Sequence, residues 1–316
     1  MSTRPVIGVG GENLIDHVTR DGAVTALPGG SPFNVALALG RQTADVRYLT
    51  PISTDRWGDL LAETLEASGV TLSGGRVAKP STIARVTVTN GIPTYDFERD
   101  GTAERAVTPQ SLAAIMPDDI AALHTGSLAL TEGLDGAAWE ETCKSAFENG
   151  TLVSLDPNVR LSVLPDPDSF RDRIFRMMSA TGLLKLSDED LEGLCPGQTQ
   201  SAAIESVRAK TSAALVVLTR GPDGASGWIG DTRIDVTAPP VPDLVDTVGA
   251  GDTFMATLLA GLARLDALPP ERLRRLSRDE VEGLIRRAGL AAAINCGRAG
   301  CNPPTLSELE AALSAS

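Results

Sequence analysis

A nine-residue stretch, DTVGAGDTF at 246–254, places two glycines and an aspartate directly before an apolar run. Such a turn can be a simple helix start, with Asp252 as the N-cap, a device that stabilises a helix by about 1 kcal/mol. It can also be an anion site, because glycines let backbone N–H groups converge and a helix N-terminus carries partial positive charge. A carboxylate beside that site can accept the proton of an alcohol that attacks phosphorus. The stretch alone leaves both interpretations open.

A second glycine-rich cluster, PGGSPFNVA at 28–36, lies near the start of the chain. As a structural element it is a turn before a helix. As a binding element, Gly29 and Gly30 let a sugar approach the backbone, and Asn34 binds sugar hydroxyls from the first helical turn. Asp16 precedes this cluster on an expected hairpin and can accept two hydroxyl hydrogen bonds.

Several common functional motifs do not occur. There is no GxxxxGK[ST] phosphate loop and no GxSxG nucleophile elbow. GVGGEN at 8–13 lacks the third glycine of the dinucleotide fingerprint, which disfavours an NAD-dependent oxidoreductase. The histidines His17 and His124 are isolated, and no His/Cys group has the spacing of a zinc site.

Composition narrows the classes of partner. The chain has 28 basic and 41 acidic residues among 316, a net charge of −13, which argues against nucleic-acid and anionic-membrane partners. An anionic small ligand is still compatible, because backbone amides and a few local cations can bind phosphate. The four cysteines form no CxxC pair, and we find neither a signal-type segment nor an apolar run of bilayer length. We therefore expect a reduced, soluble, cytoplasmic protein.

The order of expected elements predicts an α/β fold. From residue 120 onward, strands and helices alternate, which implies a Rossmann-like, doubly wound, mostly parallel sheet flanked by helices. Other expected elements are a strand at 6–11, helices at 33–40, about 133–149 and about 168–180, a strand at 46–53, and a helix that Asp55 caps.

Two hairpins interrupt this pattern. They are expected at 14–27 and 81–99, with Asp21-Gly22 and Asn90-Gly91 as turns. We interpret them as a small β-sheet lid on the α/β body. The predicted boundaries are 1–11, 31–80 and 104–316 for the body, and 12–30 and 81–103 for the lid.

Polar clusters follow three expected strands of the body: Asp156-Pro157-Asn158, Lys185-Leu186-Ser187 and Thr219-Arg220-Gly221. Ligands of open α/β sheets bind beyond the carboxyl ends of the strands. The polar residues therefore mark the expected binding edge.

Together, GGSPFNVA and DTVGAGDTF resemble the two signature regions of the PfkB (ribokinase-like) carbohydrate kinases. The resemblance runs from GVGGENLIDHV to NCGRAGCNPPT and covers nearly the whole chain. Further segments resemble bacterial fructokinases: GENLIDH, YDFERDGTA, HTGSLAL, DPNVR and KLSDED.

The resemblance implies an ATP-dependent sugar kinase with a β-sheet lid, and it implies roles for individual residues. Asp252 would be the base, and Gly249, Ala250 and Gly251 the anion hole. The residues implied for the sugar are Asp16, Gly29, Gly30, Asn34, Phe97, Arg99 and Arg160. Those implied for ATP are Lys185, Thr219, Gly221, Gly224 and Asn295. Mg²⁺ is the implied metal, since it neutralises phosphates.

Some positions depart from the family pattern. Where many members have Asn-x-x-Glu, this chain has Ser187-Asp188-Glu189-Asp190, so Asp190 would act only indirectly on Mg²⁺. The family's monovalent-cation loop falls near Asp246 and Gly300, and Pro304 replaces a serine of some relatives. Activation by K⁺ therefore stays open.

Asp16 favours a neutral sugar, because a buried carboxylate would repel an acidic substrate. Fructose is the expected acceptor, with 2-keto-3-deoxygluconate and ribose as alternatives. For the keto-acid, Arg99 and Arg160 could pair with its carboxylate, although both arginines could instead form structural ion pairs. A catalytically silent sugar-binding regulator is the alternative from another class. A homodimer through the lid would cover the exposed edges of its sheet.

Overall fold

The computed structural model describes residues 4–20, 23–89, 92–131, 133–161, 164 and 166–315. The turns predicted at Asp21-Gly22 and Asn90-Gly91 lie outside the described residues. No helix in the described ranges is long and apolar enough to cross a bilayer.

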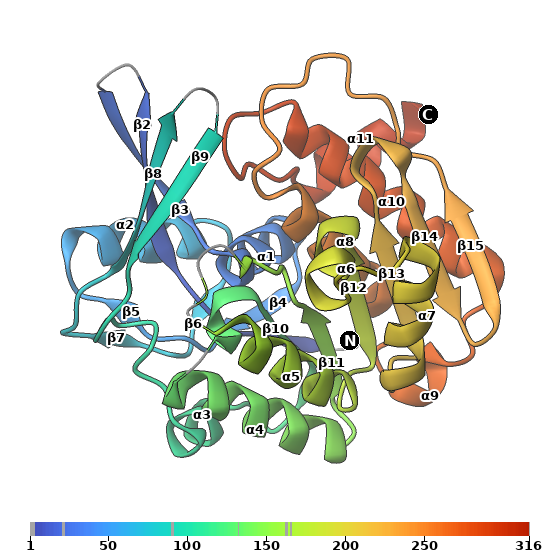
Figure 1. Ribbon diagram of the computed structural model, residues 1–316, viewed down its shortest axis with the longest axis horizontal. Coiled ribbons are helices and arrows are strands. Elements are labelled where there is room, and N and C mark those ends of the chain that lie inside the picture. The colour runs from blue at the N-terminus through green and yellow to red at the C-terminus, as the bar shows by residue number, and fades with distance from the viewer. Residues whose placement is uncertain are drawn as a thin grey trace.

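A large, mostly parallel sheet forms the centre of the molecule (Figure 1). Its order is β15-β14-β13-β12-β11-β10-β1-β4-β6; neighbours from β13 to β6 run parallel, and β14 and β15 run antiparallel. The strands are β1 (Val6–Val9), β4 (Asp45–Tyr48), β6 (Thr71–Leu72), β10 (Ile120–Gly126), β11 (Leu152–Asp156), β12 (Leu183–Ser187), β13 (Leu215–Thr219), β14 (Ala225–Ile229) and β15 (Thr232–Val236).

Helices cover both faces of this sheet, as the strand–helix alternation predicts (Figure 1). Successive residues of a strand point to opposite faces, so in β13 Leu215 and Val217 enter one core, whereas Val216 and Leu218 enter the other. The helices with residues in the first core are α1 (Ser31–Arg41), α2 (Arg56–Glu66), α8 (Ala250–Arg264), α9 (Pro270–Leu273) and α10 (Arg278–Cys296). Those with residues in the second are α3 (Pro109–Ile115), α4 (Leu134–Glu148), α5 (Pro167–Met178), α6 (Asp188–Leu194) and α7 (Gln200–Lys210). Near the end of the chain, α11 (Leu306–Ala315) packs on α10.

Helices α1 and α8 pack against each other in the interior. Residues 31–40 of α1 and 252–262 of α8 are all buried. Both sequences are apolar around most of the helix and rich in Ala, which is typical of a helix without a solvent face. This packing brings two helix starts together although they lie more than 200 residues apart in the sequence.

A four-stranded sheet stands beside the body, at the upper left of Figure 1. Its order is β3-β2-β8-β9; the two hairpins are antiparallel, and β2 pairs with β8 in parallel. The strands are β2 (Leu14–Arg20), β3 (Ala23–Gly29), β8 (Thr82–Thr89) and β9 (Ile92–Glu98). The prediction of a small separate sheet is confirmed, whereas its behaviour as a moving lid with the predicted boundaries stays a prediction.

Local predictions hold in part. Asp55 caps α2 by accepting from the backbone N–H groups of Trp57 and Gly58 at 3.0 and 2.8 Å. The single strand expected at 46–53 is wrong: β4 ends at Tyr48, and β5 (Ile52–Ser53) pairs with β7 (Arg76–Val77) in a separate two-stranded sheet. The break is a bend at Thr50, and the following Pro51 has no N–H to continue a ladder.

Candidate active site

Asp252 lies in the first turn of α8 and faces the start of α1. Its Oδ1 accepts a hydrogen bond from the Ser31 hydroxyl at 2.7 Å, and its Oδ2 accepts from Asn34 Nδ2 at 2.8 Å. Burial raises the pKa of Asp252, while these two hydrogen bonds and the charges of Lys185 and Arg160 oppose the rise. The carboxylate is therefore buried, oriented and more basic than an exposed aspartate.

The N-cap of α8 is Gly249, so the interpretation of Asp252 as the cap is wrong. Gly249 has φ +74°, and a Cβ at this position would lie 2.4 Å from Cys301 Sγ, which leaves room for glycine only. Within the described residues, the backbone N–H groups of Gly251 and Asp252 donate to no protein acceptor. Unpaired N–H groups at a helix start form an anion site.

A lysine lies beside this turn. Lys185, at the carboxyl end of β12, is bonded through Nζ to Asp156 Oδ2 of the neighbouring strand at 2.6 Å, and both side chains are buried. A Cβ added to Gly251 would lie 3.2 Å from the same Nζ. Although burial alone lowers the pKa of Lys185, nearby carboxylates, above all Asp156, raise it above its usual value. The anion site thus has a permanent cation next to its N–H groups.

Asp190 performs a structural task in this fold. Its Oδ2 accepts from the Ser187 N–H at 2.7 Å and completes the capping box of α6, while its Oδ1 accepts from the Val159 N–H at 2.6 Å. Both oxygens are therefore occupied by backbone. The indirect role of Asp190 toward a metal stays a prediction.

Among the residues predicted to bind the sugar, Asp16 lies on β2 and has no hydrogen-bond partner among the described residues. Burial raises the pKa of Asp16 to about 6. A Cβ on Gly29 would lie 2.4 Å from Asp16 Oδ2, so glycine keeps this carboxylate accessible. Gly30 has φ +106°, and a Cβ there would lie 2.5 Å from the Glu12 carbonyl oxygen. Asn34 Oδ1 is buried and has no partner in the described structure, which leaves one acceptor for a ligand.

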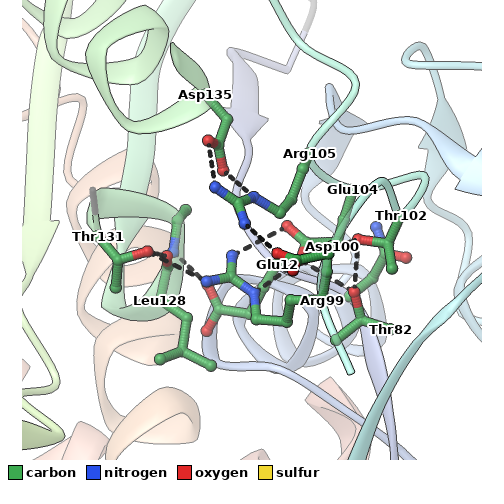
Figure 2. Close-up of polar contacts among 12 residues, drawn as sticks. Glu12, Thr82, Arg99, Asp100, Thr102, Glu104, Arg105, Leu128, Thr131 and Asp135 are labelled. Carbon is green, nitrogen blue, oxygen red and sulfur yellow. Dashed lines mark hydrogen bonds and ion pairs between the residues drawn. The ribbon is translucent and has the colours of Figure 1, made fainter. Parts of the chain in front are cut away.

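Arg99 follows β9 and lies in a buried ion cluster, which Figure 2 shows. Its guanidinium donates to both oxygens of Glu104, at 2.9 and 3.3 Å, and to Thr131 Oγ1 at 3.1 Å. These contacts match the structural alternative for Arg99. The other predicted lid residue, Phe97, is partly buried and packs against a small apolar cluster that includes Leu14.

Arg160 is exposed at the binding edge, where its Nη1 donates to the Val159 carbonyl at 3.0 Å. Its charge lowers the pKa of Asp252, so it acts on the same site through space. The structure therefore places the charge of Arg160 within reach of Asp252 and leaves its guanidinium open to solvent.

The predicted nucleotide residues fall at two places. Thr219 ends β13, and the following loop turns through Gly221 and Gly224, with φ +50° and +85°. Asn295 is fully buried in α10, donates to the Val248 carbonyl and accepts from the Asn302 N–H, each at 2.8 Å. Asn295 thus ties the loop before α8 to the loop after α10, while its role toward ATP stays a prediction.

Three residues of the site were not assigned from the sequence. Ser31 stands between Gly30 and Asn34 in the quoted cluster, so its position in that motif was an available signal. Asp156 was noted only as a polar strand end. Glu12 lies in the quoted segment GENLIDH, which was an available signal, but its burial and its partners cannot be recognised from its neighbours in sequence.

Comparison with known proteins adds relationships of sequence and fold. A family model described as pfkB family carbohydrate kinase matches residues 11–308. A fructokinase from Rhizobium leguminosarum bv. trifolii is 39% identical over 270 residues, covering 83% of this chain and 81% of that protein.

Solved structures show the same fold. A fructokinase from Xylella fastidiosa with bound ATP has a TM-score of 0.90 at 23% identity, covering 99% of each chain. A fructokinase from Vibrio cholerae O395 with fructose, ADP and calcium has a TM-score of 0.84 at 21% identity, covering 98% of each chain. These likenesses confirm the predicted fold class.

Proposed function

We propose that this chain, which belongs to the pfkB family of carbohydrate kinases, transfers the γ-phosphate of ATP to a primary hydroxyl of fructose. The observation that carries the proposal is the buried Asp252 carboxylate, held by Ser31 and Asn34 beside the unpaired N–H groups at the start of α8. The 39% identity to a protein named fructokinase supports fructose as the acceptor.

Asp252 acts as the general base. It takes the proton of the sugar hydroxyl while the hydroxyl oxygen bonds to the γ-phosphorus and the bond from phosphorus to the bridging oxygen of ADP breaks. General-base catalysis contributes about 10²- to 10⁴-fold. The raised pKa of Asp252 suits this role, since a more basic carboxylate is a better proton acceptor at neutral pH.

The start of α8 receives the transferring phosphoryl group. Its negative charge is met by the N–H groups of Gly251 and Asp252 and by the Lys185 ammonium. Each is in place before the substrates bind, because the fold holds Lys185 against Asp156 and fixes the turn at Gly249. Loss of one such donor typically costs about 10²- to 10³-fold in rate.

Mg²⁺ fits this site as a companion of ATP. The described residues contain no group of three His, Cys, Asp or Glu side chains that could hold a metal, and backbone N–H groups occupy both oxygens of Asp190. We therefore expect the phosphates and water to hold the ion, a binding mode that Mg²⁺ favours. When bound, it neutralises phosphate charge.

The charges around the sugar favour a neutral acceptor. Asp16 offers an unpaired carboxylate that would repel an acid, and Arg99, which a keto-acid would need, is already paired with Glu104. Arg160 is the one predicted arginine partner of the keto-acid that stays open to solvent. These observations support fructose over 2-keto-3-deoxygluconate and do not distinguish it from ribose.

The loop that leads into α8 offers an apolar surface for the base of the nucleotide. Leu244, Val245 and Val248 are 63, 58 and 48% exposed, which is unusual for side chains of this size. Apolar groups that gather beside a polar site are typical of ligand surfaces. We infer that the adenine covers part of this loop.

Further expectations belong to the same proposal. Asp246 accepts from the Gly300 N–H at 3.0 Å, which joins the two loops expected to hold K⁺.

A homodimer through the edges of the lid sheet is expected from their exposed backbone groups, and gel filtration tests it. The acidic net charge of −13 supports the absence of nucleic-acid partners.

An ADP-release assay over a panel of sugars tests the proposal. The wild type should form ADP with fructose and far less with 2-keto-3-deoxygluconate. Asp252→Asn should lower kcat by about 10²- to 10⁴-fold. Its fold should survive, because Asn34 can turn its amide and present the unpaired Oδ1 to the new NH₂ group. A folded wild type without sugar-dependent ADP release would favour the silent regulator, and an Asp252→Asn enzyme of full activity would exclude Asp252 as the base.

A further inference from the structure

The chain passes four times between the body and the small sheet. Residues at three of these passages lie in one buried polar cluster (Figure 2), and the residue at the fourth, Ser31, donates its backbone N–H to Glu12 of that cluster. Glu12 precedes β2, Ser31 follows β3, Thr82 begins β8 and Arg99 follows β9. Glu104, on the returning chain, accepts from Thr82 Oγ1 at 3.0 Å and from the Arg99 guanidinium. The cluster therefore forms the root of the lid.

Glu12 connects this root to the start of α1. Its Oε1 accepts from the Ser31 N–H at 3.1 Å, and its Oε2 accepts from the Ala129 N–H at 3.0 Å. Ala129 belongs to a short 3-10 helix, Ser127–Leu130, that follows β10 of the body. One buried carboxylate thus clamps the first residue of α1 to the central sheet.

Ser31 continues the connection to the base. Its backbone N–H is bound to Glu12, and its hydroxyl donates to Asp252 at 2.7 Å. The two bonds point in different directions from one residue, so a shift of the Ser31 backbone would change the hydroxyl geometry at Asp252. Gly30, directly before Ser31, allows no side chain because of the nearby Glu12 carbonyl. The start of α1 is therefore held through Glu12 on one side and through Asp252 on the other.

The cluster also sets the charge of Glu12. Burial raises its pKa to about 7, although the charge of Arg99, a backbone hydrogen bond and the Ser127 side chain oppose the rise; the charge of Glu104 adds to it. Asp135 pairs with Arg105 on the far side of the cluster, through two bonds of 3.0 Å. A buried carboxylate with a raised pKa is costly for stability, which suggests a functional reason for its presence.

We propose that Glu12 is a positioning residue for phosphoryl transfer: by clamping Ser31 to Ala129, it holds the Ser31 hydroxyl on Asp252 and couples the root of the lid to the base. This inference rests on the proposed function. It assigns Glu12 a contribution to kcat that a purely structural buried carboxylate would not make.

A double-mutant cycle tests the coupling. Glu12→Gln keeps the shape, but its amide can accept only one of the two N–H groups and turns a donor toward the other, so the clamp is lost. Ser31→Ala removes the bond to Asp252. We expect each single variant to lower kcat by about 10- to 100-fold, because a hydrogen bond to a charged group is lost. The double variant should match Ser31→Ala within about twofold, since both changes act through the same bond.

Asp135→Asn is the matched control. Asp135 is buried like Glu12, with 5% of its surface exposed against 1%, and lies in the same cluster, but it contacts neither Ser31 nor Ala129 in the described structure. It should lower the melting temperature and leave kcat and the KM for ATP within about twofold of the wild type. Should Glu12→Gln not fold, Glu12→Asp keeps the charge, shortens the reach by one carbon and replaces it in the cycle.

Three results would overturn the inference. One is an unchanged kcat in the Glu12 variant; another is a double variant whose loss is the product of the single losses. A third is an Asp135→Asn enzyme with the same fall in kcat, which would show that the Glu12 variant lowers kcat only through a general loss of stability. A wild type without fructose-dependent ADP formation would instead contradict the proposed function and this inference together, so the two failures are distinguishable.

Discussion

Asp16 allows the sharpest test of sugar binding, because its carboxylate is mostly buried yet has no partner in the described structure. Two substitutions separate its charge from its shape: Asp16→Asn keeps the shape, and Asp16→Ala removes the group. If the carboxylate accepts two sugar hydroxyls, each bond contributes about 1.5 to 3 kcal/mol, and each 1.4 kcal/mol is a tenfold change in affinity. Asp16→Ala should therefore raise the KM for fructose by more than about tenfold. The effect on kcat should be smaller, since we propose Asp252, not Asp16, as the proton acceptor.

The pKa of Asp16 adds a second, independent signal. Burial raises it from 3.8 to about 6, so between these two pH values Asp16 is mostly protonated in the folded state and mostly ionised in the unfolded state. Protonation of Asp16 therefore adds to the free energy of unfolding. The contribution is complete below pH 3.8 and is lost as pH rises through about 6. The shift of about two pH units corresponds to roughly 3 kcal/mol. Between pH 7.5 and pH 4, the wild type should therefore gain up to about that much relative to Asp16→Asn, in which this titration is absent.

Urea unfolding at several pH values and steady-state kinetics measure the two effects. Taking the difference between two pH values cancels the constant cost of the unpaired amide in Asp16→Asn. The wild-type KM for fructose should also rise as pH falls below about 6, whereas that of Asp16→Asn should stay flat. An unchanged KM in both variants would remove Asp16 from the sugar site. A constant stability difference from pH 4 to 7.5 would refute the desolvation argument.

Two further predictions concern the phosphate side. Gly249→Ala should lower the free energy of unfolding by about 1 to 2 kcal/mol, because alanine disfavours the left-handed backbone at this position. It should also lower kcat by at least tenfold, because the added Cβ would meet Cys301 and shift the turn. An enzyme with wild-type kcat would contradict the role of this turn. Lys185→Met should raise the KM for ATP and lower kcat by about 10²-fold, because it removes the cation beside Gly251 and leaves Asp156 unpaired. A change in the KM for fructose alone would place Lys185 at the sugar instead.

Patterns within single segments predicted the local structure well. The Asp55 cap, the two hairpins and the strands that end at Asp156, Ser187 and Thr219 follow from residues close together in sequence. Caps, turns and alternation depend on contacts within a few residues, so they are visible in one segment. The strand expected at 46–53 was wrong because the apolar run conceals a change of sheet, which depends on distant partners.

Long-range pairing decided the roles of the charged residues. Arg99 was equally compatible with a substrate carboxylate and with an ion pair until the fold placed Glu104 against it. Asp190 was expected to act on a metal only indirectly, and the fold adds what the sequence did not show: its oxygens close the capping box of α6 and accept from the Val159 N–H. Glu12 had no assignment at all. The sign and number of charges around a buried group depend on which elements pack together, and no spacing rule contains that information.

The sequence by itself determined the α/β class, the small sheet, the family resemblance and the glycine-rich start of α8 with Asp252, because each rests on residues adjacent in the chain. Only the tertiary structure decided that Asp252 binds Ser31 and Asn34, which lie 221 and 218 residues away. The packing of α1 against α8 creates that contact, and the burial that accompanies it raises the pKa of the carboxylate. Desolvation and hydrogen-bond geometry exist only once distant helices meet, so the raised pKa of Asp252 is a property of the fold.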